Sequence, residues 1–200
     1  DPDFGTYPYV TSSPPTAAGA CQGSGIGPAH LDRVLGVFKA YATRVGQGPM
    51  PTEMAPATGN LVRERGQEYG ATTGRPRRCG WFDAVAARFA AQVNGIGGAI
   101  ITRLDVLDAL PSIKICTRYS LNGSFLDTVP SDPDLLARCQ PVFQEWPGWQ
   151  TATTGVRRFD DLPSRAQDYV NAISRVTGCP LYLVSVGPRR EETIEVRDVF

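Results

Sequence analysis

The sequence GAIITRL at positions 98–104 decides the fold, because it is a short apolar run of the kind that forms a strand buried on both faces. A second run of this kind, LYLVSV, occupies positions 181–186. Apolar residues with helical spacing precede each run, over 82–93 and over 162–176. This alternation predicts an α/β fold: part of a mainly parallel sheet with flanking helices.

The segments around these two units predict a hairpin, another helix and several loops. Asn122-Gly123, between apolar segments, is a strong signal for a β-hairpin. A helix is expected over 29–45, with Pro28 in its first turn and Gly46 at its end. The Gly-, Pro- and Ala-rich stretch 14–28 and the proline-rich stretch 46–59 predict loops, and further strands are expected over 140–146 and 193–196.

Composition describes an ordinary globular protein without a global charge bias. The chain has 200 residues, with 20 basic and 20 acidic side chains, so nothing global favours nucleic acid or an anionic membrane as a partner. No apolar run approaches membrane-spanning length. The five cysteines are widely spaced and include no Cys-x-x-Cys pair, which favours buried thiols in a reducing compartment. We therefore expect a cytoplasmic protein.

The opening stretch looks like the interior of a domain. The chain begins at Asp1 without a methionine, and residues 5–13 already run from a turn through a strand-like segment to a cluster of hydroxyls. Such loops need a scaffold to hold them. We expect residues 1–200 to be the later part of one longer domain.

The sequence GATTGRPRR at positions 70–78 is the most informative stretch for function. Three arginines within four positions stand directly behind two threonines on a glycine-flanked loop. Guanidinium groups hold carboxylates and phosphates bidentately, and glycine permits backbone conformations that side chains block. A bare run of arginines is usually a solvated charge cluster. The order of glycines, hydroxyls and arginines favours an anion-binding loop instead.

Polar residues follow both predicted buried strands. Asp105 follows the first strand, while Ser185 and Gly187 end the second. Ligands of open α/β sheets bind beyond the carboxyl ends of the strands. A carboxylate there can accept both the ring N–H and the exocyclic amino group of guanine, with Arg103 lying against the base. An isolated Asp after a strand is otherwise a turn or helix cap, a role for which Asp108 is suited. The two strand ends together predict a purine pocket.

Taken in order, several longer motifs resemble adenylosuccinate synthetase over essentially the whole chain. They are GTYPYVTSS at 5–13, KAYATRVG at 39–46, GPMPTE at 48–53, GATTGR at 70–75, GWFD at 80–83, LDVLD at 104–108, PGW at 147–149 and SVGP at 185–188. The resemblance implies the C-terminal portion of the P-loop-like fold of that family. It also implies that residues 1–200 form part of a single domain whose phosphate-loop half lies outside this sequence.

The resemblance implies a ligation in the synthesis of AMP. Members of the family couple IMP and L-aspartate, with GTP and Mg2+, to give adenylosuccinate, GDP and phosphate, and they act as homodimers. GTP first phosphorylates the 6-oxygen of IMP, which turns a poor leaving group into phosphate, and the amine of aspartate then attacks C6. Both steps move negative charge, so a positive, water-poor site stabilises them.

The resemblance also implies roles for individual residues. Arg75 resembles a residue that serves aspartate and the IMP ribose, Arg77 one that reaches aspartate and the GTP phosphates, and Asp105 the carboxylate that selects guanine. The implied aspartate and IMP site consists of Thr11, Val45, Ala71, Thr72, Thr73, Gly74, Arg75 and Arg77. The implied GTP site consists of Arg77, Arg103, Leu104, Asp105, Ser185, Val186 and Gly187.

The sequence departs from the family at several positions. Arg103 stands where the family usually has Lys, and Pro14 where Asn is expected. Pro76 falls inside the loop at positions 70–78, which we call the arginine loop. No G-x-x-x-x-G-K pattern occurs, and the sole histidine, His30, lies outside the family's catalytic motif, so we read it as a surface or cap residue. We therefore expect no catalytic residue and no metal ligand in this chain, and no phosphoryl transfer by it alone.

Two other readings remain open. The chain could be a catalytically silent module that binds a guanine nucleotide or IMP. It could also be a structural remnant, because half of an α/β sheet exposes apolar strand edges that favour aggregation. A preference for GDP over ADP separates the binding module from the remnant.

Overall fold

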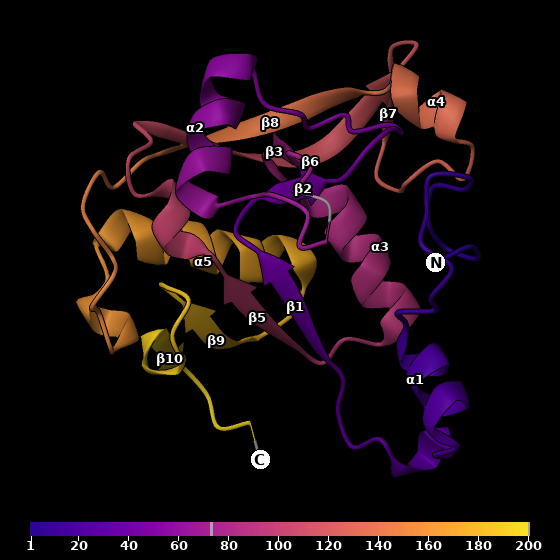
Figure 1. Cartoon of the computed structure of the whole chain (residues 1–200), viewed down its shortest axis with the longest axis horizontal. Helices are drawn as coiled ribbons and strands as arrows, with labels where there is room; N and C mark the ends of the chain where they lie inside the picture. The colour runs from indigo at the N-terminus through magenta and orange to yellow at the C-terminus, as the bar shows by residue number, and fades with distance from the viewer. Residues whose placement is uncertain (73, 200) are drawn as a thin grey trace.

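A mainly parallel sheet forms the centre of the computed structural model, which describes residues 1–72 and 74–199. In the described part of the chain its order is β1 (Leu35–Lys39), β5 (Gly98–Thr102), β9 (Leu181–Ser185) and β10 (Thr193–Glu195). The first three strands run parallel, and β10 is antiparallel to β9 (Figure 1). The predicted α/β fold with a mainly parallel sheet is confirmed.

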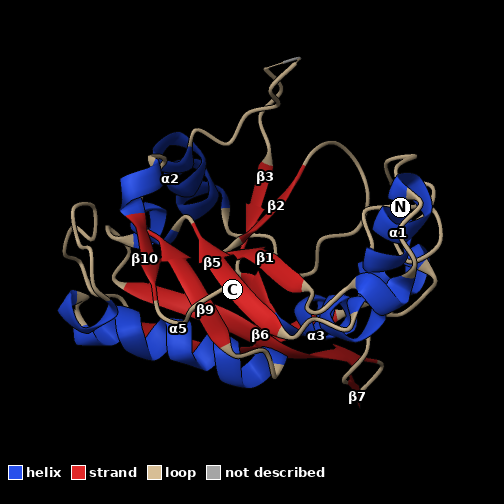
Figure 2. Ribbon diagram, turned by 90° about the horizontal axis from the view of Figure 1, so that it is seen from below, coloured by secondary structure: helices blue, strands red, loops and turns tan. Residues whose placement is uncertain are grey.

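Two amphipathic helices cover this sheet. α5 (Ser164–Thr177) lies along one face of it and contacts α3 (Ala84–Asn94) (Figure 2). Asp83 accepts hydrogen bonds from two N–H groups in the first turn of α3, and Gly95, in the left-handed conformation, follows the end of that helix. Both helices were predicted from the spacing of their apolar residues.

A second sheet is built around the long strand β6 (Ser112–Leu121). It pairs with β4 (Phe82–Asp83), β7 (Ser124–Leu126) and β8 (Gln140–Pro147). Between β6 and β7, Asn122 has φ 52° and Gly123 has φ 83°. Positive φ at both central positions is the signature of a two-residue type I′ turn, and the predicted hairpin is confirmed.

The remaining elements lie around the two sheets. β2 (Ala42–Arg44) and β3 (Arg78–Gly80) form an antiparallel pair, and the arginine loop leads into β3. The short 3-10 turns include η2 (Leu104–Leu107), directly after β5, and η4 (Arg190–Glu192), before β10. The other helices and strands are α1 (Ala17–Ser24), β2 (Ala42–Arg44), α2 (Pro56–Gly66), β3 (Arg78–Gly80) and α4 (Pro133–Arg138).

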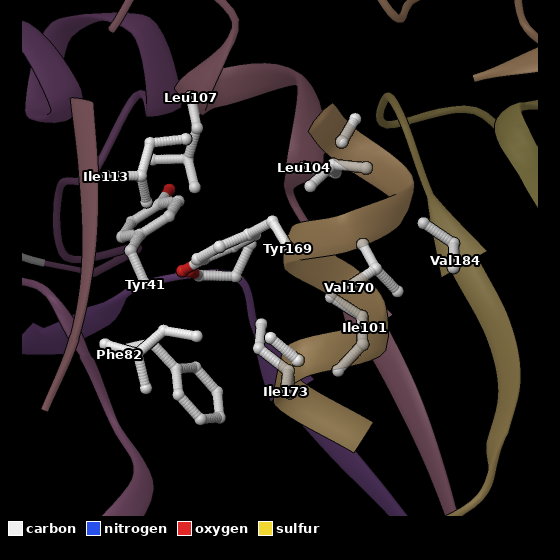
Figure 3. Packing of buried hydrophobic residues seen from close by; sticks show 14 of the residues in the cluster. Tyr41, Phe82, Ile101, Leu104, Leu107, Ile113, Tyr169, Val170, Ile173 and Val184 are labelled. Atoms are coloured by element: carbon white, nitrogen blue, oxygen red, sulfur yellow. The ribbon is translucent and has the colours of Figure 1, made fainter. Parts of the chain in front are cut away.

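One large apolar cluster lies between α5 and the strands (Figure 3). Burial of such side chains contributes about 1.5–3 kcal/mol each before entropy is counted. Tyr169 of α5 is fully buried, and its hydroxyl donates to the carbonyl oxygen of Ala40 at 2.6 Å. This bond ties the helix to the chain just beyond β1, at the sheet edge where the polar residues gather.

The predicted helix over 29–45 is wrong. The structure has β1 and β2 there, and β1 pairs with β5 along its whole length. Apolar residues at 34, 35, 38, 41 and 42 fit a helical spacing, but pairing in a buried parallel sheet overrides that local pattern. Gly36 also suits the strand, because a Cβ there would lie 2.5 Å from Ile96.

Helices also replace parts of the two predicted loops. Pro56 opens α2 at its first turn, where the missing N–H costs nothing, so this proline begins a helix rather than marking a loop. Thr16 caps α1 by accepting from the N–H of Gly19 at 3.0 Å. Residues 5–13, expected to include a strand-like segment, contain turns and bends.

Candidate functional site

The carboxyl ends of β1, β5 and β9 lie at one edge of the sheet. Lys39 is level with Thr102 in the β1–β5 ladder, and Ile101 is level with Val184 in the β5–β9 ladder. The residues that follow these strands therefore meet at the same edge. They include Asp105 and Gly187, which the sequence predicted as two walls of a base pocket.

Asp105 has an unsatisfied carboxylate oxygen. Its Oδ1 atom is buried and has no hydrogen-bond partner among the described residues. Burial raises the pKa of Asp105, and the nearby charge of Asp108 raises it further. Arg65 of α2 donates from Nε to the carbonyl of Val106 at 3.0 Å and from Nη2 to that of Asp105 at 3.2 Å. The backbone is thus held while the carboxylate is left able to accept.

The residues beside Asp105 differ in what they can present to a ligand. Arg103 is half-buried and adopts a left-handed backbone with φ 66°, which turns the chain sharply between β5 and η2. Leu104 is fully buried, and its side chain belongs to the apolar core. Only the backbone of Leu104 is placed to meet a ligand.

The end of β9 forms a tight turn against a buried carboxylate. Ser185 donates from Oγ to the carbonyl of Gly187 at 2.8 Å. A Cβ on Gly187 would lie 2.3 Å from Oε2 of the buried Glu192, so only glycine fits. That same Oε2 accepts from the backbone N–H of Arg189 at 2.8 Å. Val186 is fully buried in the core, which leaves its backbone for a ligand.

The arginine loop extends outward beyond β3 (Figure 2). It is closed at its base by bonds from Gly70 N to Arg75 O and from Gly74 N to Gly70 O, both 2.8 Å. The described loop residues Ala71, Thr72, Gly74 and Arg75 are exposed. Thr73, a predicted site residue, lies outside the described residues. The described residues of this loop therefore present their polar groups to solvent.

Arg77, at the base of the loop, is held by a fully buried carboxylate. Glu68 is 0% exposed and accepts from Arg77 Nη1 at 2.8 Å, from Lys39 Nζ at 2.8 and 2.9 Å, and from the hydroxyl of Tyr41 at 2.5 Å. Burial alone raises the pKa of Glu68, but the bonds from Lys39 and Tyr41 outweigh it and hold the pKa below its usual value. We call Glu68, Lys39, Tyr41 and Arg77 the Glu68 cluster.

Thr11 and Val45 line one cleft of about 580 Å3. Both are exposed, and Arg44 lies in the same cleft, with its Nη2 donating to Thr6 Oγ1 at 2.8 Å. Burial, and then the charge of Arg78, lowers the pKa of Arg44. The structure thus brings together two residues far apart in sequence that were both expected near IMP.

Sequence reasoning missed Glu68, Lys39 and Arg44 as site residues. Lys39 and Arg44 fell inside the helix wrongly predicted over 29–45. A glutamate such as Glu68 carries no signal in a single sequence, because burial is what distinguishes it from a surface acid. Asp108, expected as a turn or cap residue, is the C-cap of η2. It is also buried, and its carboxylate accepts from Trp149 Nε1 at 2.6 Å and Thr153 N at 2.8 Å.

Other features of the described chain bear on its chemistry. His30 is exposed at the end of a short 3-10 turn, as expected. All five cysteines are free thiols. Across residues 1–72 and 74–199, no three His, Cys, Asp or Glu side chains are grouped to hold a metal ion. Among these residues no helix is long and apolar enough to cross a bilayer.

Comparison with known proteins gives a consistent family. Residues 1–194 match the sequence family described as adenylosuccinate synthetase. The adenylosuccinate synthetase of Geotalea daltonii is 54% identical over 200 residues, which are 100% of this chain and 46% of that protein. That of Dehalococcoides mccartyi is 57% identical over 194 residues, 97% of this chain and 46% of the relative. The chain therefore spans about half the length of these relatives.

Comparison with solved structures gives the same family. The fully ligated adenylosuccinate synthetase from Plasmodium falciparum is similar with a TM-score of 0.96 and 39% identity, covering 98% of this chain and 47% of that one. A cyanophage S-2L succinoaminodeoxyadenylate synthetase is similar with a TM-score of 0.56 and 19% identity, covering 97% of this chain and 42% of the other, and it supports the fold alone.

Proposed function

The chain belongs to the adenylosuccinate synthetase family, and we propose that it supplies the guanine pocket, the aspartate loop and part of the IMP site of a GTP-dependent ligase. The reaction joins IMP and L-aspartate to adenylosuccinate and releases GDP and phosphate, in the synthesis of AMP. Residues 1–200 form the C-terminal share of one domain, in a homodimer in the cytoplasm. Its partners are these small molecules rather than nucleic acid or a membrane.

One observation carries the proposal: Asp105, which follows β5 at the sheet edge where Lys39 ends β1, has a buried Oδ1 without a hydrogen-bond partner among the described residues. An unpaired carboxylate oxygen in a buried position is costly unless a ligand donates to it. Guanine offers two adjacent N–H donors that adenine lacks in that arrangement. Arg103, Leu104, Ser185, Val186 and Gly187 complete the pocket, with Leu104 and Val186 contributing backbone.

The arginine loop and the cleft at Thr11 and Val45 are proposed to bind the anionic groups of the substrates. Arg77 reaches an aspartate carboxylate and the GTP phosphates from a fixed base, whereas Arg75 on the exposed loop closes on aspartate and the IMP ribose. Thr72, Thr73 and the backbone at 71 and 74 line the aspartate carboxylates. Thr11 and Val45, in their shared cleft, meet the phosphate and ribose of IMP. Closing such a loop excludes water and strengthens each charge interaction.

The described residues hold no cluster of three His, Cys, Asp or Glu side chains that could form a protein-only site for the Mg2+ implied by the family. Mg2+ is usually held by one or two carboxylates together with waters and substrate phosphates. Asp105 offers a single unpaired oxygen, which the proposal gives to guanine. The chemistry assigned to this chain is therefore limited to binding and orienting its ligands.

Reconstitution tests the proposal. This chain is co-produced with the part of the Geotalea daltonii synthetase that it does not match, and adenylosuccinate and phosphate are measured with IMP, aspartate, GTP and Mg2+. We expect product only from the mixture and only when all three substrates are present. A mixture that associates but forms no adenylosuccinate contradicts the ligase proposal.

One alternative is a catalytically silent module that binds a guanine nucleotide or IMP through the same pocket. Such a module binds GDP in preference to ADP on its own, and calorimetric titration of both measures that preference. It gives no turnover in the reconstituted mixture. Equal affinity for GDP and ADP contradicts the guanine pocket in either reading.

A further inference from the structure

The Glu68 cluster contains the least exposed charge in the site. A fully buried carboxylate loses its hydration, and a triad of buried charges is often no more stable than apolar residues of similar volume. Three donors from different parts of the chain nevertheless converge on it: Lys39 ends β1, Tyr41 follows it, and Arg77 lies at the base of the arginine loop. The fold alone does not call for this arrangement.

Glu68 and Arg77 are joined at two points, and Arg63 adds a third bond to Arg77. Arg77 N donates to Glu68 O at 2.9 Å, Arg77 Nη1 donates to Glu68 Oε2 at 2.8 Å, and Arg63 Nε donates to Arg77 O at 2.7 Å. Both the backbone and the tip of Arg77 are therefore fixed. By contrast, Arg75 lies exposed on the loop. Arg77 is thus held by its neighbours, whereas Arg75 is exposed to solvent.

The cluster retains a capacity for an anion. The Nε atom of Arg77 is buried and has no hydrogen-bond partner among the described residues. Two cations surround one carboxylate, so the cluster carries one surplus positive charge at the carboxyl end of β1. A fixed, partly desolvated positive charge attracts an anionic group more strongly than a mobile one in water.

We propose that Glu68 is a positioning residue that holds Arg77 ready for the carboxylate of aspartate. The inference rests on the proposed function, because that function brings aspartate to Arg77. Fixing the guanidinium before binding removes the entropic cost of ordering a long side chain on contact. Substitution of Glu68 therefore weakens aspartate binding without touching the base pocket or the IMP cleft.

The test measures KM for each substrate in the reconstituted enzyme with Glu68→Gln, Arg77→Ala and the double variant. Glu68→Gln is expected to raise the aspartate KM about tenfold or more, the size of one charge-assisted hydrogen bond. The IMP KM stays within about twofold; a general loss of folded enzyme instead lowers Vmax and leaves the aspartate KM unchanged as well. In the Arg77→Ala background, Glu68→Gln has no further effect.

Glu53→Gln is the matched control, because Glu53 pairs with the neighbouring Arg78 at 2.5 Å on the exposed side of β3. Its aspartate KM is expected within about twofold of the unsubstituted enzyme. If Glu68→Gln does not fold, Glu68→Asp keeps the charge but shortens its reach, and the same rise in the aspartate KM is expected.

Three results separate the claims. An unsubstituted mixture that does not ligate removes the proposed function, and the inference with it. An active mixture in which the folded Glu68 variant leaves the aspartate KM unchanged overturns the inference alone. Additive effects of Glu68→Gln and Arg77→Ala also overturn it, because Glu68 then does not act through Arg77.

Discussion

Three acidic side chains near the sheet edge have different surroundings, and the surroundings set their roles. Glu68 forms ion pairs with two cations. Asp108 accepts hydrogen bonds from neutral donors of Trp149 and Thr153. Asp105 alone of the three keeps a buried oxygen without a partner among the described residues. The carboxylates of Glu68 and Asp108 are occupied by donors of the protein itself, whereas Asp105 keeps an oxygen free to accept from a ligand.

The proposed role of Asp105 in guanine binding predicts a dependence on pH, because the pKa of Asp105 is raised. Guanine donors bind the charged carboxylate, and burial favours the neutral form in the free protein. GDP affinity is therefore full above the raised pKa of Asp105 and is lost as the pH falls through it. Titrations of GDP at stepped pH values check this, with Asp105→Asn as control. An equally steep pH dependence in Asp105→Asn contradicts the assignment.

Asp108 is predicted to matter for stability rather than for binding. Asp108→Ala leaves the buried donors of Trp149 and Thr153 unpaired, and we expect a loss of about 2–4 kcal/mol in the free energy of unfolding. Urea denaturation measures this loss, with the exposed Asp168→Ala expected within about 0.5 kcal/mol of the unsubstituted chain. A loss no larger than that of Asp168→Ala would show that the network contributes little.

At the scale of elements, local chemistry predicted some structures and long-range pairing decided others. Asn122-Gly123 specifies its hairpin by itself, and the stripe of α5 is visible in its spacing. β1 was mistaken for a helix because its partner β5 lies about sixty residues away in sequence. Local patterns also identify only part of the site. Loop residues were predicted from motifs, but the Glu68 cluster depends on contacts that only the fold creates.

The start of α3 offers a test of one such element. Asp83 accepts from Val85 N and Ala86 N at 3.1 Å and also from the hydroxyl of Tyr119 at 2.6 Å. Asp83→Ala is expected to lower the free energy of unfolding by about 1–2 kcal/mol through loss of the cap. Asp83→Ser keeps a capping oxygen, so it should retain part of that stability in thermal and urea unfolding. Equal losses in the two variants contradict a capping role.

At the scale of the whole molecule, the central sheet has two edge strands in the described chain. β10, of three residues, is antiparallel to its neighbour, whereas β1, of five residues, is parallel to its neighbour and has Val37 67% exposed. Phe38, Phe82 and Ala87 line an apolar cavity of about 280 Å3 beside it. Such an edge is a template for pairing with another strand.

We expect the isolated chain to self-associate through β1. Val37→Lys places a charge on this edge and should lower the weight-average mass at a given concentration, as measured by sedimentation or light scattering. Ile26→Lys, a similarly exposed apolar residue away from the sheet, serves as control and should leave the mass unchanged. Equal masses for Val37→Lys and the unsubstituted chain place the contact elsewhere.

The separate origins of the base pocket and the Glu68 cluster have a consequence for ligand use. The pocket comes from the connections after β5 and β9, and the cluster from β1 and the turn after α2. Under the proposed function, substitutions after β5 and β9 change the choice of base first, because the Glu68 cluster does not contribute to that pocket. Arg77 is proposed to meet both aspartate and the nucleotide phosphates, so substitutions in the cluster change the use of both ligands together.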